Sequence, residues 1–242
     1  EYVNGPSLFD IMRNGPVPPD VVNRLCHRLA SGLNAAHEAG TVHRDLSPDN
    51  IILPGGNVDR AKIIDFGIAR SANIGGETLI GGRFAGKYNY VSPEQLGLFG
   101  GEVTEQSDIY SLGGTLYHAI TGVPPFEGVD ATAVVKARFE GPPKPMSEIR
   151  DDIPKEVEAI ITRMLEVEPQ TRFPTYGSLL GDMRRYLSKA GPVRMVEKTN
   201  KKIVIKGKRG VTGRMSTTGA LSTTGSVTGN VDELPPGMTP VE

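Results

Sequence analysis

Apolar residues recur every three or four positions in four stretches of the chain, which is the spacing of a buried helix face. The first stretch follows the start signal Pro18-Pro19-Asp20 and stops at Gly40. Ser107 can cap the second, which ends before Pro124-Pro125, and the third begins at Pro154. We predict four helices with these apolar positions: Val22, Leu25, Leu29, Leu33 and Ala36; Ile109, Leu112, Leu116 and Ile120; Val157, Ile160, Ile161, Met164 and Leu165; Leu179, Leu180, Met183, Tyr186 and Leu187.

Two short apolar runs flank a turn-forming stretch, Pro54-Gly55-Gly56-Asn57. The runs are Ile51-Ile52-Leu53 and Lys62-Ile63-Ile64, and their spacing predicts a small β-hairpin. The pattern as a whole therefore predicts a mainly α fold: a helical bundle with one small β-hairpin. Polar residues cluster beside this hairpin, so we place the active site there.

The composition changes near the C-terminus, where Gly, Ser, Thr and Pro dominate residues 190–242 and Ser-Thr-Thr-Gly occurs twice, at 216–219 and 222–225. Such a segment cannot bury enough apolar surface to offset the chain entropy lost on folding. We expect one folded domain over residues 1–188 and a disordered basic linker over residues 189–242. The basic residues from Arg194 to Arg214 are either a solvated charge run or a contact for an anionic surface.

The charge and cysteine content narrow the class of protein. The formal net charge is −1, so no overall field favours nucleic acid or a membrane surface. No apolar run approaches the roughly 20 residues that span a bilayer. The single cysteine, Cys26, cannot form an internal disulfide and lies among apolar helix positions, so we interpret it as a packing residue. We expect a cytoplasmic protein without a nucleic-acid partner.

Polar side chains lie at both ends of the predicted hairpin. The segments that precede and follow it are His43-Arg44-Asp45-Leu46-Ser47-Pro48-Asp49-Asn50 and Asp65-Phe66-Gly67. Pairing of the two strands brings together Asp45, Asn50 and Asp65. Phosphoryl transfer needs one carboxylate that accepts the proton of the attacking hydroxyl, and a carboxylate and an amide oxygen that bind Mg²⁺. The trio therefore predicts a phosphoryl-transfer site.

In order and spacing, these segments resemble the catalytic loop and the metal-binding motif of the eukaryotic-like, bacterial-type serine/threonine protein kinases. Farther along, Tyr90-Val91-Ser92-Pro93-Glu94 resembles the Ala-Pro-Glu element of this family, and the segment from Asp108 resembles the start of its central buried helix. The resemblance covers residues 1 to about 188 and corresponds to the hinge and the C-terminal lobe. It implies an enzyme that uses ATP and Mg²⁺ to phosphorylate protein hydroxyls.

The resemblance also assigns roles at the catalytic and nucleotide sites. It implies that Asp45 is the catalytic base, and that Asn50 and Asp65 bind the metal and, through it, the nucleotide. The first residues resemble the hinge between the two lobes, which implies that the backbone groups of Glu1 and Val3 bond the adenine edge. The resemblance further implies that Ser7 contacts the ribose and that the apolar side chain of Ile52 packs under the adenine ring.

The resemblance also implies structural or regulatory roles for other residues. His43 corresponds to the residue that stacks on Phe66, next to Gly67, and helps to align Asp65. The resemblance implies a buried ion pair between Arg172 and Glu94, which is costly to break. Arg44 marks kinases whose activation segment is ordered by a bound anion. The hydroxyl residues upstream of Tyr88, Ser71 and Thr78, lie earlier than the usual phosphorylation site, so we expect weak dependence on phosphorylation there.

The resemblance places the entire small lobe before Glu1, together with its Gly-rich loop and phosphate-binding lysine. We therefore expect that the sequence is a fragment, that it binds ATP poorly by itself, and that it needs the small lobe for activity.

The sequence departs from the family pattern at two positions. Ser47 stands where the family carries a lysine that touches the γ-phosphate, and Lys87 stands where it carries a threonine beside the catalytic aspartate. We hypothesise an exchange, in which the Lys87 ammonium fills the site beside Asp45 and Ser47 supplies the hydroxyl. The alternative is that Lys87 points to solvent and Ser47 marks a weakened enzyme.

Pro48 and Asp49 favour serine or threonine as the acceptor, because the tyrosine kinases of the family that the chain resembles usually carry alanine and arginine in this stretch. We therefore predict a serine/threonine protein kinase with a protein substrate. Two other functions remain open: a pseudokinase that docks protein partners without catalysis, and a small-molecule phosphotransferase of related fold. Glu94 and Arg172 argue against the latter, which usually lacks both features.

Overall fold

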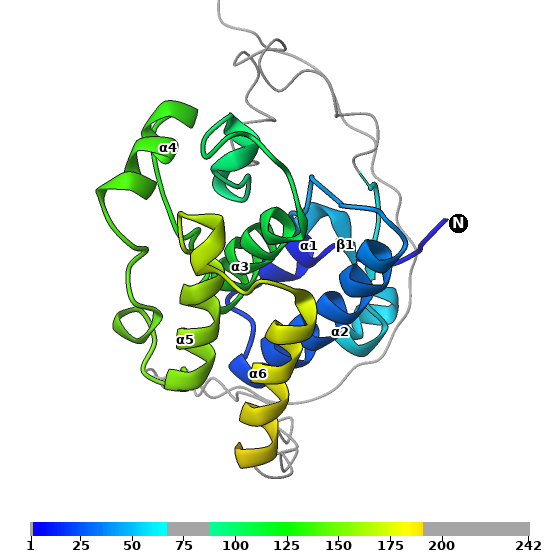
Figure 1. Cartoon of the computed structure of the whole chain (residues 1–242). Coiled ribbons are helices and arrows are strands. Elements are labelled where there is room, and N and C mark those ends of the chain that lie inside the picture. The colour runs from blue at the N-terminus through cyan, green and yellow to red at the C-terminus, as the bar shows by residue number, and fades with distance from the viewer. Residues whose placement is uncertain (1, 67–87, 191–242) are drawn as a thin grey trace, which may run out of the picture. The chain divides into compact units, whose positions relative to one another are not determined.

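The structure is a computed structural model, and it describes residues 2–66 and 88–190. Its helical body surrounds a central helix, α3, against which α2 and α5 pack, and α6 lies across α2 and α5 (Figure 1). The helices are α1 (Leu8–Met12), α2 (Pro19–Glu38), α3 (Glu105–Thr121), α4 (Ala131–Glu140), α5 (Lys155–Met164) and α6 (Tyr176–Ala190). The strands β1 (Ile51–Ile52) and β2 (Lys62–Ile63) form one small sheet. The predicted mainly α bundle with a β-hairpin is confirmed.

The four helices predicted from apolar spacing are present as α2, α3, α5 and α6. One boundary was wrong, because the cap of α3 is Thr104 and not Ser107. The Thr104 hydroxyl accepts a hydrogen bond from the Gln106 amide, and Ser107 bonds back to the Thr104 amide from the third helical position. Both hydroxyl residues thus belong to one capping box, and only the backbone geometry distinguishes their roles.

Two helices were not predicted. The five-residue α1 has a capping box, in which the Ser7 hydroxyl accepts from the Asp10 amide and the Asp10 carboxylate accepts from Ser7. The N-cap of α4 is Asp130, whose carboxylate accepts from the Ala133 amide. Both helices carry start signals, but neither is long enough or regular enough in its apolar spacing to be recognised from the pattern alone.

The central helix α3 is buried on almost every side, which suits its apolar and small residues. Gly113 allows a close approach of α5, because a Cβ atom at this position would lie 2.7 Å from the Met164 Cβ. Cys26 is buried in α2 beside Met183 of α6, and burial raises the pKa of its thiol to about 12. The thiol is therefore protonated at neutral pH, in agreement with a packing role.

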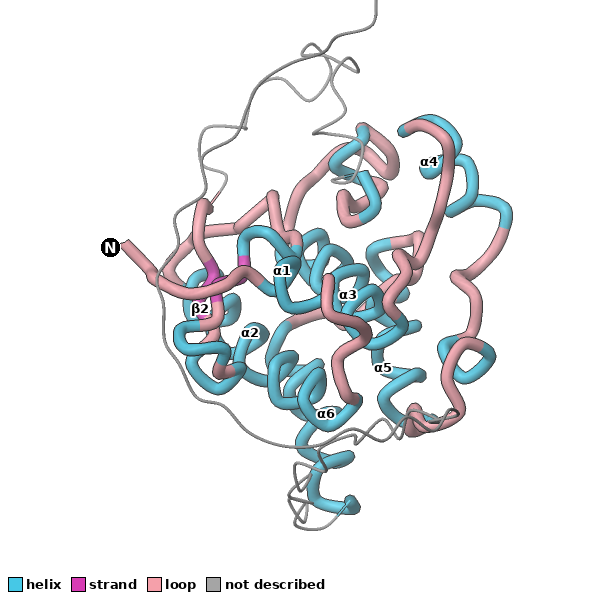
Figure 2. Tube along the Cα trace, turned by 180° about the vertical axis from the view of Figure 1, so that it is seen from behind, coloured by secondary structure: helices cyan, strands magenta, loops and turns pink. Residues whose placement is uncertain are grey.

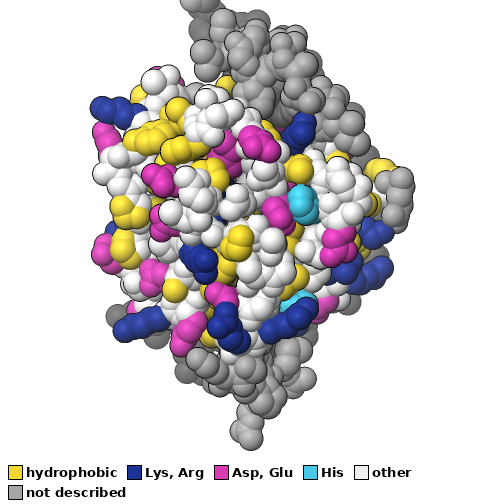
Figure 3. Space-filling view, viewed as in Figure 1, with side chains coloured by type: hydrophobic (Ala, Val, Ile, Leu, Met, Phe, Trp, Pro, Cys, Tyr) yellow, Lys and Arg dark blue, Asp and Glu magenta, His cyan; other side chains and the backbone are white. Residues whose placement is uncertain are grey.

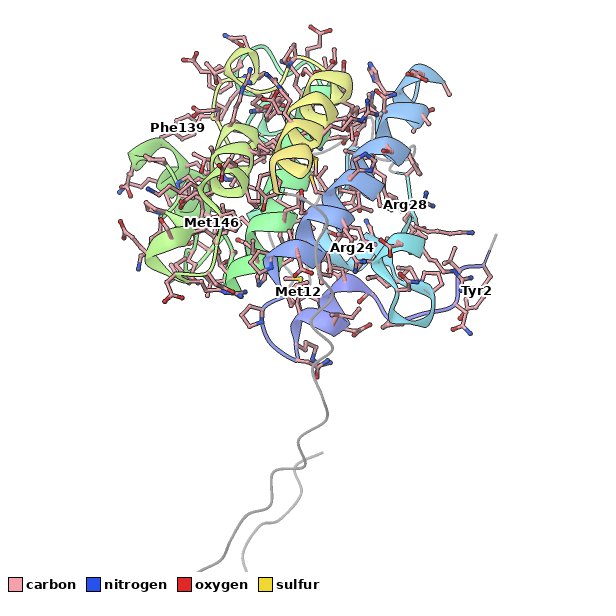
Figure 4. All side chains as sticks on the ribbon, turned by 90° about the horizontal axis from the view of Figure 1, so that it is seen from below. Tyr2, Met12, Arg24, Arg28, Phe139 and Met146 are labelled. Atoms are coloured by element: carbon pink, nitrogen blue, oxygen red, sulfur yellow. The ribbon has the colours of Figure 1, made fainter. Side chains whose placement is uncertain are left out.

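The hairpin is antiparallel, with Ile51 opposite Ile63 and Ile52 opposite Lys62. Seen from behind, it lies alongside α2 (Figure 2). Arg24 and Arg28, labelled in Figure 4, project from α2 and bond to the segment between the strands, at the Asp59 carboxylate (3.4 Å) and the Ala61 carbonyl (3.1 Å). The hairpin therefore has a fixed position on the helical body. In the described ranges, no helix has the length and apolar character needed to cross a membrane.

Candidate active site

The loop that carries Asp45 is hydrogen-bonded to the central helix α3. The buried carboxylate of Asp108, in the first turn of α3, accepts hydrogen bonds from the amides of His43 (2.6 Å) and Arg44 (2.8 Å). Burial raises the pKa of Asp108, and the two amide bonds oppose this rise. Arg44 has a left-handed backbone with φ of 67°, an unusual conformation that the flanking hydrogen bonds hold in place. Asp108 therefore positions the loop rather than taking part in chemistry.

His43 connects this loop to the far strand of the hairpin. Its Nε2 lies 3.0 Å from the Ile64 carbonyl oxygen, and its Nδ1 lies 3.2 Å from the Asp45 amide nitrogen. The first contact needs a proton on Nε2, and the second needs a lone pair on Nδ1, so the network assigns a neutral imidazole. The ring lies 4.7 Å from the Phe66 ring at a tilt of 55°. His43 therefore orients its neighbours and has no free nitrogen for proton transfer.

The three residues of the predicted trio, Asp45, Asn50 and Asp65, lie where the hairpin closes. The Asn50 amide group donates to the Asp45 carbonyl (2.7 Å) and to the Asp45 carboxylate (3.2 Å). The Ile64 amide donates to the Asn50 carbonyl oxygen at 3.0 Å, which places Asp65 beside Asn50. Asp65 is exposed and has a left-handed φ of 56°. Because the Asn50 nitrogen is engaged by Asp45, its side-chain oxygen is the atom left to bind a ligand.

Ser7 and Ile52, predicted to contact the ribose and the adenine ring, lie next to each other at one edge of the hairpin. Ser7 forms a β-bridge with Ile52, and the Leu53 amide donates to the Pro6 carbonyl at 2.9 Å. The Ser7 hydroxyl also donates to the Asp10 carboxylate at 2.8 Å, and these Ser7 bonds lower the pKa of Asp10. Val3 precedes this bridge and lines a pocket together with Pro54 and Lys62 of the hairpin segment.

Three residues of the predicted site, Glu1, Gly67 and Lys87, lie outside the described residues, as do Ser71 and Thr78. The predicted linker, apart from the last two residues of α6, lies outside them as well. Ser47 is described: it is 2% exposed, and within residues 2–66 and 88–190 its hydroxyl has no hydrogen-bond partner. The hydroxyls of Tyr110, Thr115 and Tyr176 are likewise buried without a partner in these ranges.

Glu94 and Arg172 form a two-pronged ion pair in the interior, with N···O distances of 2.8 and 3.0 Å. The exposed fractions of the two side chains are 1% and 0%. Arg172 also donates to three backbone carbonyls, those of Gln106 (2.9 Å), Glu166 (2.7 Å) and Val167 (2.8 Å). Burial raises the pKa of Glu94, but the hydrogen bonds and charge of Arg172, together with a hydrogen bond from Ser107, lower it, and the net shift is downward. The pair thus joins the segment after Pro93 to the segment between α5 and α6.

Sequence reasoning missed the contacts that place residues 88–95 beside Asp45. The Gln95 amide group donates to the Arg44 carbonyl at 2.6 Å, and Gln95 accepts from the Ser92 hydroxyl at 3.0 Å. The Tyr90 hydroxyl lies 2.6 Å from Nδ1 of His118, a histidine whose pKa is lowered by burial. His118 has no partner at helical spacing in the sequence, so its partner on a distant loop could not be identified.

The comparisons with known proteins agree on one family. The protein kinase domain family matches residues 1–181. Serine/threonine-protein kinase PknB of Mycobacterium leprae is 34% identical over 193 residues, which are 79% of this chain and 30% of PknB. Tyrosine-protein kinase MasK of Myxococcus xanthus is 39% identical over 180 residues, 71% of this chain and 27% of MasK. The chain thus spans less than a third of the length of either relative.

Among solved structures, the chain is similar to Rad53 residues 1–466 in complex with AMP-PNP. The TM-score is 0.60 and the sequence identity 27%, and the match covers 75% of this chain and 44% of the Rad53 chain. This neighbour therefore agrees with the family match in fold.

Proposed function

The chain belongs to the protein kinase family, with bacterial serine/threonine kinases among its relatives, and on this premise we propose that the complete protein transfers the γ-phosphate of ATP to serine or threonine hydroxyls of other proteins. The observation that carries the proposal is the position of Asn50, whose side chain bonds to Asp45 while its backbone bonds the strand that leads to Asp65. One hairpin thereby presents a base and two oxygen ligands together.

Each member of the trio has a distinct role in this proposal. Asp45 orients the acceptor hydroxyl and accepts its proton, because it is a carboxylate held beside the entry to the site. Asn50 and Asp65 hold Mg²⁺, and one amide oxygen and one carboxylate are a donor set that suits a cation that retains phosphate and water ligands. When bound, the metal neutralises charge on the transferring phosphate. Val3, Ser7, Ile52 and the backbone of Glu1 line the adenosine side.

We infer domain limits and surroundings from the same premise. Residues 1–188 form the hinge and large lobe of the kinase domain, and residues 189–242 form a linker. The partners are protein substrates, and the use of ATP together with the unpaired Cys26 favours a cytoplasmic location.

The exchange of Ser47 and Lys87 completes the proposed site. Ser47 is buried two residues after Asp45, and a buried hydroxyl without a partner costs about 1–3 kcal/mol. We infer that the Lys87 ammonium, arriving from the segment after Gly67, bonds to this hydroxyl and faces the γ-phosphate. A unit charge in such a site acts from either position, provided that it is close to the phosphate.

A double-mutant cycle in a complete kinase, in which this chain supplies the large lobe, tests the exchange. Lys87→Thr is expected to lower kcat about 10²–10³-fold, because one preorganised contact to the transition state is lost. Adding Ser47→Lys is expected to restore most of the rate. Lys136→Thr, at a lysine that is 76% exposed on α4, is the control. An unchanged kcat in Lys87→Thr, or no recovery in the double variant, would contradict the exchange.

Tyrosine is the second candidate acceptor, because MasK, a relative at 39% identity, is a tyrosine-protein kinase. Transfer of labelled phosphate from MgATP by the complete kinase, followed by phosphoamino acid analysis, separates the two acceptors. We expect phosphoserine and phosphothreonine, and phosphotyrosine as the main product would overturn the assignment of the acceptor.

A further inference from the structure

Arg138 is a charged residue in the interior of the protein. It lies in the last turn of α4, and only 1% of its surface is exposed. Its guanidinium lies over the rings of Tyr110 (5.5 Å) and Phe126 (5.9 Å), and burial lowers its pKa. A buried cation is costly unless hydrogen bonds and polarisable groups replace the lost water. The groups that offset the cost of burying the Arg138 charge therefore indicate which part of the chain Arg138 fixes in place.

The two hydrogen-bond partners of Arg138 belong to one short stretch of backbone, residues 88–91. Nη1 donates to the Val91 carbonyl at 2.6 Å, and Nη2 donates to the Tyr88 carbonyl. In the described part of the chain, its compensation consists of these carbonyls and two aromatic rings, without a carboxylate at ion-pair distance. The planar fork of an arginine presents separate donors in a fixed geometry and is suited to bridge two acceptors, whereas the ammonium of a lysine is a compact point charge. Arg138 thus fixes both ends of the stretch relative to α4.

The burial of Arg138, which is 1% exposed, shields this contact from water, and a groove with several aromatic side chains in its wall lies next to it. The groove has a volume of about 610 Å³, and Arg138 lines it together with Phe99, Phe126 and Phe139. Figure 3 shows hydrophobic side chains gathered over this part of the molecule, and Figure 4 labels Phe139 at the edge of the helical body. In such a surrounding, hydrogen bonds from a charged donor are stronger than on an exposed surface.

The opposite side of the same stretch borders the catalytic loop. Ser92, next to Val91, donates its amide (3.3 Å) and its hydroxyl (3.0 Å) to the side-chain oxygen of Gln95, and the side-chain nitrogen of Gln95 donates to the Arg44 carbonyl, next to Asp45. Burial raises the pKa of the Tyr90 phenol, and the nearby charge of Asp49 adds to this rise. Residues 88–91 therefore lie next to the loop that carries Asp45, to which a protein acceptor has to bring its hydroxyl. An open hollow of about 610 Å³ leads away from Asn89, and its wall includes Pro124, Val129 and Asp130.

We propose that Arg138 is a positioning residue for the protein acceptor: it holds residues 88–91 so that the chain next to the acceptor hydroxyl binds beside Asp45. This inference rests on the proposed kinase function. The ATP side of the site is built by the hairpin and by residues 2–7, none of which Arg138 contacts. Loss of Arg138 therefore changes acceptor binding and leaves ATP binding unchanged.

The test compares Arg138→Met and Arg138→Lys with the wild-type protein in the complete kinase. Arg138→Met keeps the length of the stem and leaves the Tyr88 and Val91 carbonyls without their donors. We expect the KM for a protein acceptor to rise at least about tenfold, because two charge-assisted bonds are lost. The KM for ATP and ATP hydrolysis without acceptor stay within twofold of wild type. Arg138→Lys, which reaches one carbonyl, gives an intermediate acceptor KM.

Arg163→Met is the matched control, because this arginine is 47% exposed on α5 and lies on the Phe173 ring at 4.3 Å. We expect wild-type kinetics from it. An acceptor KM within twofold of wild type in Arg138→Met overturns the proposal, and so does an equal change in both KM values, which indicates a general structural defect. If Arg138→Met does not fold, the same two criteria apply to Arg138→Lys.

Hydrogen exchange separates failure of this inference from failure of the proposed function. We expect faster amide exchange in residues 88–96 of Arg138→Met, with unchanged exchange in α2 and the hairpin. If the wild-type kinase transfers no phosphate, the proposed function fails. The hydrogen-exchange result alone then decides whether Arg138 holds residues 88–91. Unchanged exchange in residues 88–96 then overturns the role.

Discussion

Replacing Asp45 by asparagine is expected to lower kcat for phosphate transfer by a complete kinase about 10²–10⁴-fold, which is the usual contribution of a positioned general base. Asparagine has the same shape, and the Asn50 amide still bonds to the backbone carbonyl of residue 45 at 2.7 Å. The hydrogen bonds from the loop to Asp108 also remain, so the site keeps its geometry and loses only the proton acceptor. Steady-state kinetics with MgATP and a protein acceptor measure the change, and the KM for ATP is expected to stay near the wild-type value.

Asp59→Asn is the control for this substitution. Asp59 lies in the segment between the two strands, is exposed, and pairs with Arg24 at 3.4 Å, away from the trio. Its replacement is expected to leave kcat unchanged. A kcat for Asp45→Asn within tenfold of wild type would show that another group accepts the proton, and would remove Asp45 from the mechanism.

Replacing Glu94 by glutamine is expected to destabilise the chain by about 3–5 kcal/mol, the usual cost of breaking a buried ion pair from one side. The Arg172 charge would remain buried, with three backbone carbonyls and the Tyr110 ring, 4.7 Å away, as its surroundings. Urea unfolding of the 242-residue chain measures the loss as a lower midpoint at an unchanged slope. Arg172→Met is expected to have an effect of similar size, because it leaves the Glu94 carboxylate buried alone.

The exposed pair of Arg24 and Asp59 supplies the contrast. Its side chains are 47% and 56% exposed, and Asp59→Asn is expected to cost at most about 1 kcal/mol. The double variant of Glu94→Gln and Arg172→Met is expected to be more stable than the sum of the two single losses predicts, since no unpaired charge remains. Additive losses would contradict the coupling that the geometry implies.

The same pair predicts a direction for the dependence of stability on pH. The pKa of Glu94 in the folded chain lies below its ordinary value of 4.5. Its contribution to stability is therefore complete above pH 4.5 and is lost as the pH falls through the lower, folded pKa. The Glu94→Gln variant lacks this component, so its stability is expected to fall less steeply in that acid range.

The proximity of the three trio residues could be predicted from the sequence, for a local reason. Asp45, Asn50 and Asp65 lie within a few residues of two short strands, and pairing of the strands is enough to bring them together. The amphipathic helices α2, α5 and α6 are predictable for a similar reason, because their apolar spacing is regular over their whole length.

The residues that the sequence could not identify depend on contacts between distant segments. Arg138, between Lys136 and Glu140 on a short helix, has the pattern of a solvated charged residue, and its burial follows from carbonyls 47 and 50 residues earlier in the chain. The partnership of Tyr90 with His118 spans 28 residues and has no signal at helical spacing. Such contacts follow from packing in three dimensions and not from local propensity.

Phosphate transfer itself tests the central claim most directly: that Asp45, Asn50 and Asp65 form a phosphoryl-transfer site. The measurement is the rate at which a complete kinase, with this chain as its large lobe, moves labelled γ-phosphate from ATP to a protein acceptor, with and without Mg²⁺. We predict that transfer requires Mg²⁺. We also predict that Asp65→Asn lowers the rate of transfer more at low than at high Mg²⁺ concentration. Absence of transfer at saturating MgATP by a folded kinase would contradict the claim and would favour a docking function without catalysis.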